Sequence, residues 1–317
     1  MLSNCFNDNS RSMPPLEAET DGADGAMVSS RLICASAQSL YFAITYWSDG
    51  LRIKGYLGLP KKGASLPAII YNRGGNRELG ALSGPEIVPY VEAGYITVAS
   101  QYRGSTGSEG REEFGGADLN DVLNLIPLLQ GLPQFDGERL GMVGVSRGGM
   151  MTYLALKRLA LQGSNRIKVA STVGGIADVI NYAEKRTDIR LLCRELIGAD
   201  YDDVPAAYEA RSAVCWPECI NAPLLLQHGE ADWRVAVDPA RRLAELLSQA
   251  GKVVELVTYP GDDHALSANE GGLPATLAWL HQYIGGPEQE KSYARHQQRI
   301  AAVVREWPKK PSSLQRK

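Results

Sequence analysis

The chain has 317 residues, of which 44% are hydrophobic and 22% are charged, a composition typical of folded globular proteins. Its formal net charge of −3 provides no general attraction to nucleic-acid phosphates or to an anionic membrane surface. We therefore expect a small-molecule or short-peptide substrate, and neither a nucleic-acid nor a membrane partner.

The first 28 residues are polar and acidic, and we expect them to form a disordered leader before the folded domain. They lack the basic and apolar regions of a signal peptide, and no window of the chain is apolar over the roughly 18 residues that a membrane span requires. The five cysteines follow no regular framework, which suits a reducing compartment. The sequence therefore predicts a cytoplasmic protein.

Two β-rich runs in residues 40–60 surround Asp49-Gly50, a dipeptide typical of tight hairpin turns. From residue 67 onward, short runs rich in Val, Ile and Leu alternate with helical patterns. Such runs, separated by helices, are typical of a mainly parallel sheet that is covered on both faces. We expect a doubly wound α/β domain over residues 29–286, with an N-terminal β-hairpin.

Three segments depart from this simple alternation. The helix predicted from Asp118 to Leu129 contains Pro127, which should kink or end it because proline removes a backbone donor and clashes one turn back. Residues 177–217 contain no strong strand pattern and are a candidate cap or pocket wall over the strand ends. For the basic tail at residues 287–317 we expect a solvated surface helix, with packing against a second copy in a homo-oligomer as the alternative.

The sequence GVSRG at residues 144–148 matches G-x-S-x-G, the pattern of a nucleophile elbow. In such an elbow a serine lies on a strained turn between a strand and a helix, and the glycines leave room for neighbouring backbone. The pentapeptide alone is weak evidence, but here it follows the apolar run LGMVGV and precedes the helical pattern MMTYLALKRLAL. We therefore predict that Ser146 is a nucleophile.

A serine nucleophile needs a base to accept its proton, and the chain has four histidines. His264 lies in the polar loop YPGDDHAL, directly after a predicted strand, where an imidazole can reach the carboxyl edge of a parallel sheet. His228 ends an apolar strand, and His281 and His296 lie in helical or tail sequence, so we expect structural or surface roles for these three. A metal site beside His264 would need further ligands that are not nearby.

The base in turn needs a carboxylate to orient it. The sequence HGEADWRV follows a predicted strand and offers Glu230 and Asp232. We choose Asp232 because it lies further into the turn, with Glu230 as the alternative. Ser146, Asp232 and His264 then follow the chain order Ser, Asp, His that is typical of α/β-hydrolases.

Four motifs in this order, YRGSTGSEG, GVSRGG, PLLLQHGEADWRV and YPGDDHAL, resemble the catalytic domain of prolyl-oligopeptidase-like serine hydrolases, which include dipeptidyl and acylaminoacyl peptidases. The resemblance covers roughly residues 40–285 and implies an α/β-hydrolase fold. It implies Ser146 as nucleophile, Asp232 as orienting acid and His264 as base, with no cofactor or metal required. Fewer than 60 residues precede the core strands, too few for the β-propeller that peptidases of this group usually carry.

The same resemblance places the oxyanion hole at YNRGGNRE. One donor should be the backbone N–H of Arg147, and a second should come from the Gly74-Gly75 turn. Members of the group commonly carry His or Tyr just before this glycine pair, whereas this chain carries Arg73. Arg73 could supply a charged donor, bind a substrate carboxylate or pair with a structural acid.

A second departure from the group is Asp263, where a small residue usually precedes the histidine. Its charge could raise the pKa of His264 or compete with Asp232 for the imidazole. The sequence thus predicts a serine hydrolase that cleaves a small acyl ester, amide or short peptide through an acyl-enzyme, with carboxylesterase activity preferred. A peptidase of the prolyl-oligopeptidase type is the alternative, and a catalytically silent binding protein is the alternative from another class.

Overall fold

The computed structural model describes residues 22–286 and 293–308 of the chain. Residues 1–21 of the predicted leader, and residues 287–292 and 309–317 of the predicted tail, lie outside the described residues. Within the described ranges, no helix has both the length and the apolar content needed to cross a membrane.

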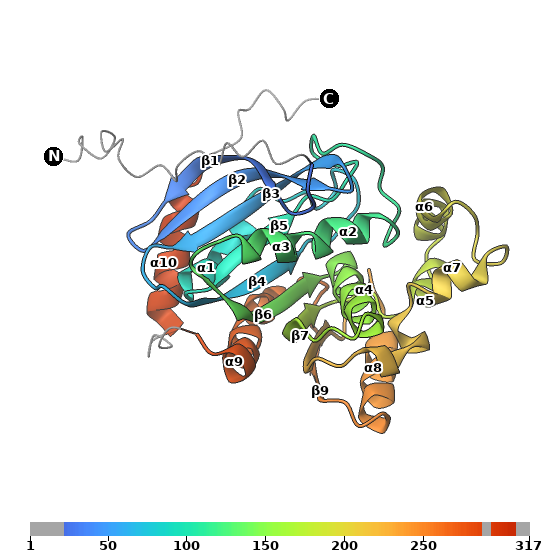
Figure 1. Ribbon diagram of the computed structural model, residues 1–317. Coiled ribbons are helices and arrows are strands. Elements are labelled where there is room, and N and C mark those ends of the chain that lie inside the picture. Colours follow the sequence, from blue (N-terminus) through green and yellow to red (C-terminus); the bar gives the residue numbers. More distant parts are fainter. Residues whose placement is uncertain (1–21, 287–292, 309–317) are drawn as a thin grey trace.

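The described residues form a nine-stranded sheet with helices on both faces (Figure 1). Its strand order is β1-β2-β3-β5-β4-β6-β7-β8-β9, antiparallel from β1 to β5 and parallel from β5 to β9. The strands are β1 (Met27–Ala35), β2 (Ser39–Ser48), β3 (Leu51–Pro60), β4 (Leu66–Asn72), β5 (Ile96–Ser100), β6 (Phe135–Val145), β7 (Ile167–Val173), β8 (Leu224–Gly229) and β9 (Val254–Tyr259). The α-helices are α1 (Val88–Glu92), α2 (Asp118–Leu123), α3 (Leu125–Gln130), α4 (Arg147–Leu161), α5 (Val179–Glu184), α6 (Thr187–Ile197), α7 (Pro205–Glu209), α8 (Asp238–Gln249), α9 (Leu273–Ile284) and α10 (Tyr293–Glu306). Short 3-10 helices lie at Pro85–Ile87, Ala213–Cys215, Pro217–Cys219 and Ser267–Gly272.

The predicted hairpin is confirmed: β2 and β3 pair antiparallel, with Ser48 opposite Leu51. The two turn residues, Asp49 and Gly50, have φ angles of 53° and 73°, which suit a two-residue turn with both central residues in the left-handed region. The edge strand β1 was not expected from the sequence. Most of its side chains are exposed, so it lacks the buried alternation that reveals a strand.

Alternate residues of the central strands pack into different cores, as a sheet covered on both faces requires. Ile69 and Val143 pack with Leu280 of α9 on one face. Ile70 and Met142 belong to the larger core on the opposite face, which includes residues of α2, α3, α4 and α8. The predicted doubly wound, mainly parallel sheet is therefore confirmed.

The helix predicted from Asp118 to Leu129 is instead two short helices, α2 and α3, which meet at Asn124. The break lies before Pro127 rather than at it. A proline ring clashes with the carbonyl group four residues earlier, which here belongs to Leu123 at the end of α2. Pro127 itself fits in the first turn of α3, where its missing N–H leaves no helical hydrogen bond unmade.

Residues 177–217 form helices α5, α6 and α7, which lie together at one side of the molecule (Figure 1). Asp178 caps α5 by accepting a hydrogen bond from the N–H of Asn181 at 3.0 Å. A cavity of about 240 Å³ lies between α5 and the turn that follows β8, and Tyr182 and Trp233 are among the residues that line it. The segment thus forms one wall of a cavity beside the carboxyl ends of the strands.

Helix α10 in the predicted tail packs on its own domain. Val303 is 3% exposed and lies in a core with residues of α1. Trp307, just beyond the helix, meets Tyr41 edge to face at 5.4 Å between ring centroids and donates a hydrogen bond to the carbonyl of Ser83 at 3.0 Å. One face of this helix is therefore buried, in contrast to the expected solvated surface helix.

Candidate active site

Ser146 lies on a sharp turn between β6 and α4, at a φ of 57° and a ψ of −123°. A positive φ in a residue other than glycine costs of order 1–3 kcal/mol, so the surrounding structure must hold it in place. The backbone N–H of Ser146 donates to the carbonyl of Val173 at 2.9 Å. A Cβ at Gly148 would collide with the carbonyl of Asn72, and one at Gly144 would collide with the carbonyl of Gly148. The glycines of the GVSRG pattern are therefore required by close backbone packing.

The structure brings Asp232 and His264 together, 32 residues apart in sequence. Oδ2 of Asp232 lies 2.6 Å from Nδ1 of His264. The alternative acid, Glu230, instead forms an ion pair with Arg241 at 2.9 Å and is directed to the surface. The His264 ring lies against Gly174, where an added Cβ would be 2.9 Å from Nδ1. Gly174 directly follows Val173, so the imidazole lies beside the same strand end that anchors the serine.

A second histidine contacts the same carboxylate and was not expected from the sequence. Nε2 of the buried His228 lies 3.1 Å from Oδ2 of Asp232 and 2.9 Å from the carbonyl of Val235. Both neighbours are acceptors, which requires a hydrogen on Nε2. Burial alone would raise the pKa of Asp232, but hydrogen bonds from His228, His264 and the N–H of Val235 outweigh it and hold that pKa well below its usual range.

Asp263 does not compete for the imidazole in the way that its position suggested. Its carboxylate accepts hydrogen bonds from the N–H groups of Ala265 and Ser267, both at 3.0 Å, and from the Ser267 hydroxyl at 2.9 Å. These bonds hold the pKa of Asp263 below its usual value.

In the part of the chain that the structure describes, no group of three or more His, Cys, Asp or Glu side chains could hold a metal ion.

The Gly74-Gly75 turn follows β4 and lies directly against Ser146. A Cβ at Gly74 would be 3.0 Å from Cβ of Ser146, and a Cβ at Gly75 would collide with the carbonyl of Leu79. Gly75 also has a φ of 69°, which favours glycine. Among the described residues, the backbone N–H groups of Gly74 and Gly75 have no protein acceptor, as oxyanion donors require.

The side chain of Arg73 is buried beneath this turn, which corrects all three expectations for it. Its guanidinium donates to the carbonyl groups of Gln101 at 2.8 Å and 3.0 Å, Arg77 at 3.1 Å and Gly74 at 3.1 Å, and to the Ser105 hydroxyl at 2.9 Å. These bonds use Nε, Nη1 and Nη2. Arg73 is therefore neither placed as an open donor nor paired with an acid among the described residues, but braces the turn from inside.

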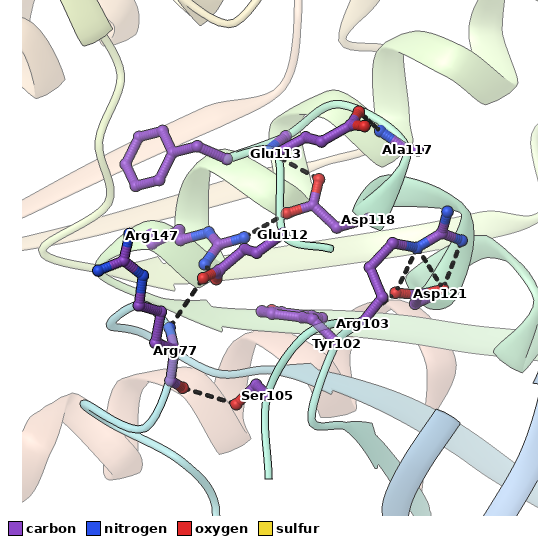
Figure 2. A network of polar contacts seen from close by, with 12 residues as sticks. Arg77, Tyr102, Arg103, Ser105, Glu112, Glu113, Ala117, Asp118, Asp121 and Arg147 are labelled. Carbon is purple, nitrogen blue, oxygen red and sulfur yellow. Dashed lines mark hydrogen bonds and ion pairs between the residues drawn. The ribbon is translucent and has the colours of Figure 1, made fainter. Parts of the chain in front are cut away.

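The side chain of Arg147 is also buried, and it forms ion pairs with Glu112 and Asp118 (Figure 2). Its side chain is 2% exposed, and those of the two acids are 3% and 0% exposed. The guanidinium lies 5.1 Å from the ring centroids of Tyr102 and Phe114. The two acids were not expected from the sequence: Glu112 lies in an irregular loop and Asp118 begins α2, about 30 residues before Arg147.

The fold and the elbow define an α/β-hydrolase, and residues 82–287 match the family model of the prolyl oligopeptidase family. The chain belongs to this family of serine peptidases and is thus a hydrolase, as the sequence predicted. It is 33% identical over 229 residues to the uncharacterized peptidase YtmA of Bacillus subtilis, a match that covers 72% of this chain and 88% of the relative. The family supports the peptidase alternative over the preferred carboxylesterase.

Other relatives are longer than the chain. Dipeptidyl-peptidase 5 of Porphyromonas gingivalis is 25% identical over 257 residues, which cover 75% of this chain but 37% of that protein. The acylaminoacyl peptidase of Pyrococcus horikoshii superposes with a TM-score of 0.68 at 23% identity, over 82% of this chain and 44% of that one. The chain therefore spans about two fifths of the length of these two proteins, and the structural match shows a shared fold.

Proposed function

We propose that the protein hydrolyses amide bonds of short peptides or acylated amino acids through an acyl-enzyme, with Ser146 as nucleophile, His264 as base and Asp232 as orienting acid. The observation that carries this proposal is the 2.6 Å contact between Asp232 and His264, beside the strand end that anchors the strained serine. A carboxylate at Nδ1 favours the tautomer with a hydrogen on that nitrogen, which leaves Nε2 free to accept a proton.

In this mechanism the Ser146 hydroxyl attacks the substrate carbonyl while Nε2 of His264 accepts its proton. Asp232 stabilises the imidazolium that forms, and its depressed pKa keeps the carboxylate ionised. The negative charge on the carbonyl oxygen is stabilised by the N–H of Arg147 and by an N–H of the Gly74-Gly75 turn. His264 then donates its proton to the leaving amine, and a water molecule hydrolyses the acyl-enzyme.

The cavity between α5 and the turn after β8 supports a small substrate. It adjoins Asp232, and its lining combines the aromatic residues Tyr182 and Trp233 with the cations Lys185 and Arg186. We infer that this cavity is part of the substrate site, and that residues 177–217 form its wall. A volume of about 240 Å³ fits a few amino-acid residues rather than a folded protein chain.

Labelling with a fluorophosphonate probe tests the nucleophile. We expect wild-type protein to be labelled and folded Ser146→Ala to remain unlabelled; equal labelling of the two would rule out Ser146. Hydrolysis of an aminoacyl-anilide and of a short p-nitrophenyl ester then tests the substrate class. We expect cleavage of the anilide, and an enzyme that cleaves the ester alone would contradict a peptidase.

We also infer a cytoplasmic location, since the four cysteines within the described residues are all free thiols, which suits a reducing compartment. Fractionation of cells that express the full chain tests this location.

Two expectations stay predictions: that the protein binds no nucleic acid, and that it forms a homo-oligomer. Light scattering of the purified protein, with and without added DNA, checks both.

A further inference from the structure

Beneath the elbow lies a charged cluster whose burial needs an explanation beyond stability. Arg147, Glu112 and Asp118 are almost fully buried, and removing such charges from water costs several kcal/mol per ion. Replacing a buried ion pair with apolar side chains is often neutral or stabilising, so the cluster does not follow from stability alone. Its geometry, in contrast, connects it to the segment that follows the Gly74-Gly75 turn, since Glu112 contacts Arg77 (Figure 2).

Two buried arginines hold two successive carbonyl groups of this turn. Nη1 of Arg73 donates to the carbonyl of Gly74 at 3.1 Å, and Nη1 of Arg147 donates to the carbonyl of Gly75 at 3.2 Å. In a trans peptide the N–H points opposite to the C=O of the same plane. The Arg73 contact with the Gly74 carbonyl therefore fixes the direction of the Gly75 N–H. The Arg147 contact with the Gly75 carbonyl fixes the next peptide plane, which carries the Asn76 N–H.

The same cluster holds the far end of the turn. The Glu112 carboxylate that pairs with Arg147 also accepts a hydrogen bond from the N–H of Arg77 at 2.8 Å. Asp118, the second partner of Arg147 and the first residue of α2, accepts a hydrogen bond from the N–H of Gly115 at 2.9 Å, which fixes its carboxylate. The guanidinium thus links Glu112, in the loop before α2, and Asp118, at the start of α2, to the turn at Gly75, while Glu112 also holds the turn at Arg77.

The ring of Tyr102 contacts both buried arginines. The guanidinium carbons of Arg73 and Arg147 lie 5.0 Å and 5.1 Å from its centroid, so both cations contact the same buried ring. Its hydroxyl donates to the carbonyl of Arg73 at 3.2 Å. The Tyr102 ring therefore holds both guanidinium groups in place. Because these groups bind the carbonyls of Gly74 and Gly75, the ring also restricts any shift of the turn.

We propose that the side chain of Arg147 is a positioning group for the oxyanion hole: by fixing the Gly75 carbonyl and, through Glu112, the Arg77 N–H, it holds in place the Gly74-Gly75 turn, whose N–H groups serve the carbonyl oxygen bound at Ser146. One residue then serves the hole twice, because its own backbone N–H is a donor and its side chain holds the turn that supplies the other. This inference rests on the proposed function. A hole that loosens by about 1 Å loses on the order of 100-fold in rate, which makes the role measurable.

A matched control lies in the same region of the molecule. Arg103 forms a buried ion pair with Asp121, with side chains 6% and 0% exposed, and it also contacts Asp49 at 2.7 Å. The Arg103–Asp121 and Arg147–Asp118 ion pairs both appear in Figure 2. The guanidinium of Arg103 contacts the β2–β3 hairpin and α2 instead of the Gly74-Gly75 turn. Its loss therefore reproduces the cost of breaking a buried pair without loosening the hole.

The test compares Arg147→Met with Arg103→Met at a temperature where circular dichroism shows both variants fully folded. We expect Arg147→Met to lower the rate constant of fluorophosphonate labelling by roughly 10- to 100-fold, and Arg103→Met to leave it within about threefold of wild type. On an aminoacyl-anilide, kcat should fall for Arg147→Met with little change in KM, as when an interaction made in the transition state is lost. Equal losses in both variants would overturn the proposal.

Milder variants serve if either arginine variant fails to fold. Glu112→Gln removes the charge facing Arg147, and Asp121→Asn does the same for Arg103; we expect a slower labelling rate in the first variant alone. Arg147→Lys keeps the charge but not the forked donor geometry, so partial recovery relative to Arg147→Met would support positioning. Labelling of wild type that does not depend on Ser146 would instead refute the proposed function, which this control separates from the role of Arg147.

Discussion

The carboxylate of Asp232 lies between two imidazoles: its Oδ2 is 2.6 Å from Nδ1 of His264 and 3.1 Å from Nε2 of His228. Its Oδ1 accepts hydrogen bonds from the N–H groups of Arg234 at 2.8 Å and Val235 at 2.9 Å. With both oxygens engaged, the carboxylate is not free to rotate. The orientation of His264 is therefore set by β8 and the turn that follows it, and not by the loop of His264 alone.

Asp232→Asn should lower kcat on an aminoacyl-anilide by about three to four orders of magnitude while the protein stays folded, because a carboxamide no longer enforces the hydrogen on Nδ1 of His264. Steady-state kinetics measure the effect. Glu230→Gln is the matched control, since Glu230 lies two residues away and pairs with Arg241. Comparable losses in the two variants would contradict the choice of Asp232.

Asp232 should also make stability depend on pH. Its pKa is depressed in the folded state, so it contributes stability that is fully present above the unfolded value of about 3.9 and is lost as the pH falls below it. The difference in free energy of unfolding between wild type and Asp232→Asn should therefore shrink on going from pH 6 to pH 3. Urea unfolding at several pH values measures it.

A difference that stays constant over this pH range would show that Asp232 is not held ionised by its neighbours. His228→Leu provides a second measurement, because it removes one of the donors that lower the pKa of Asp232. We expect this variant to lose less stability on acidification than wild type does. His228→Gln, which keeps a donor at this position, should lie between the two.

Gly74→Ala should leave the protein folded but slow its reaction. The new Cβ would lie 3.0 Å from Cβ of Ser146 and 3.0 Å from the carbonyl of Val145, so the turn must shift by a few tenths of an ångström away from the nucleophile. We expect roughly a tenfold loss of kcat, by displacement of an oxyanion donor. Gly131→Ala is the control, since its nearest neighbour would be 3.4 Å away. Unchanged kinetics in Gly74→Ala would place the hole elsewhere.

Trp307→Ala should lower the free energy of unfolding by about 2 kcal/mol and leave kcat unchanged, because the ring packs on Tyr41 in a separate core from the residues of α4 that follow Ser146. Thermal or urea unfolding measures the loss. Val304→Ala, in the same segment but at a 42% exposed position, should cost less than about 0.5 kcal/mol. Equal stability of Trp307→Ala and wild type would show that the packing of Trp307 on Tyr41 does not stabilise the domain.

Local patterns predicted the elements that local interactions determine. Asp49-Gly50 specifies its own turn within two residues, and the G-x-S-x-G pattern is recognisable within five, although the close neighbour of Gly148 is the distant Asn72. The break between α2 and α3 was expected at Pro127 but lies at Asn124, since the proline acts on a carbonyl group one turn earlier. The exposed edge strand β1 could not be recognised, because it has no buried face.

The polar partners of the site were harder to predict because they come from distant segments. Glu112 reaches Arg147 from an irregular loop that has no periodicity to indicate its direction, and Asp118 reaches it from the first residue of α2. His228 ends an apolar strand, which suggested burial but not a contact with Asp232. Arg73 was expected to face a substrate or an acid, whereas nearby carbonyl groups accept its hydrogen bonds. A sequence gives the residue type at such positions but not the side to which the side chain turns.

The order of the strands places the Gly74-Gly75 turn on one side of Ser146 and the residues Asp232 and His264 on the other. β6 leads into Ser146; its neighbour β4 leads into the Gly74-Gly75 turn, while β8 and β9, beyond β7, lead into the turns that carry Asp232 and His264. In the proposed mechanism, negative charge therefore develops toward one half of the sheet, and protons move in the other half. Mutations in the two halves should combine almost independently in free energy wherever they share no contact, so the two functions can be tuned one at a time.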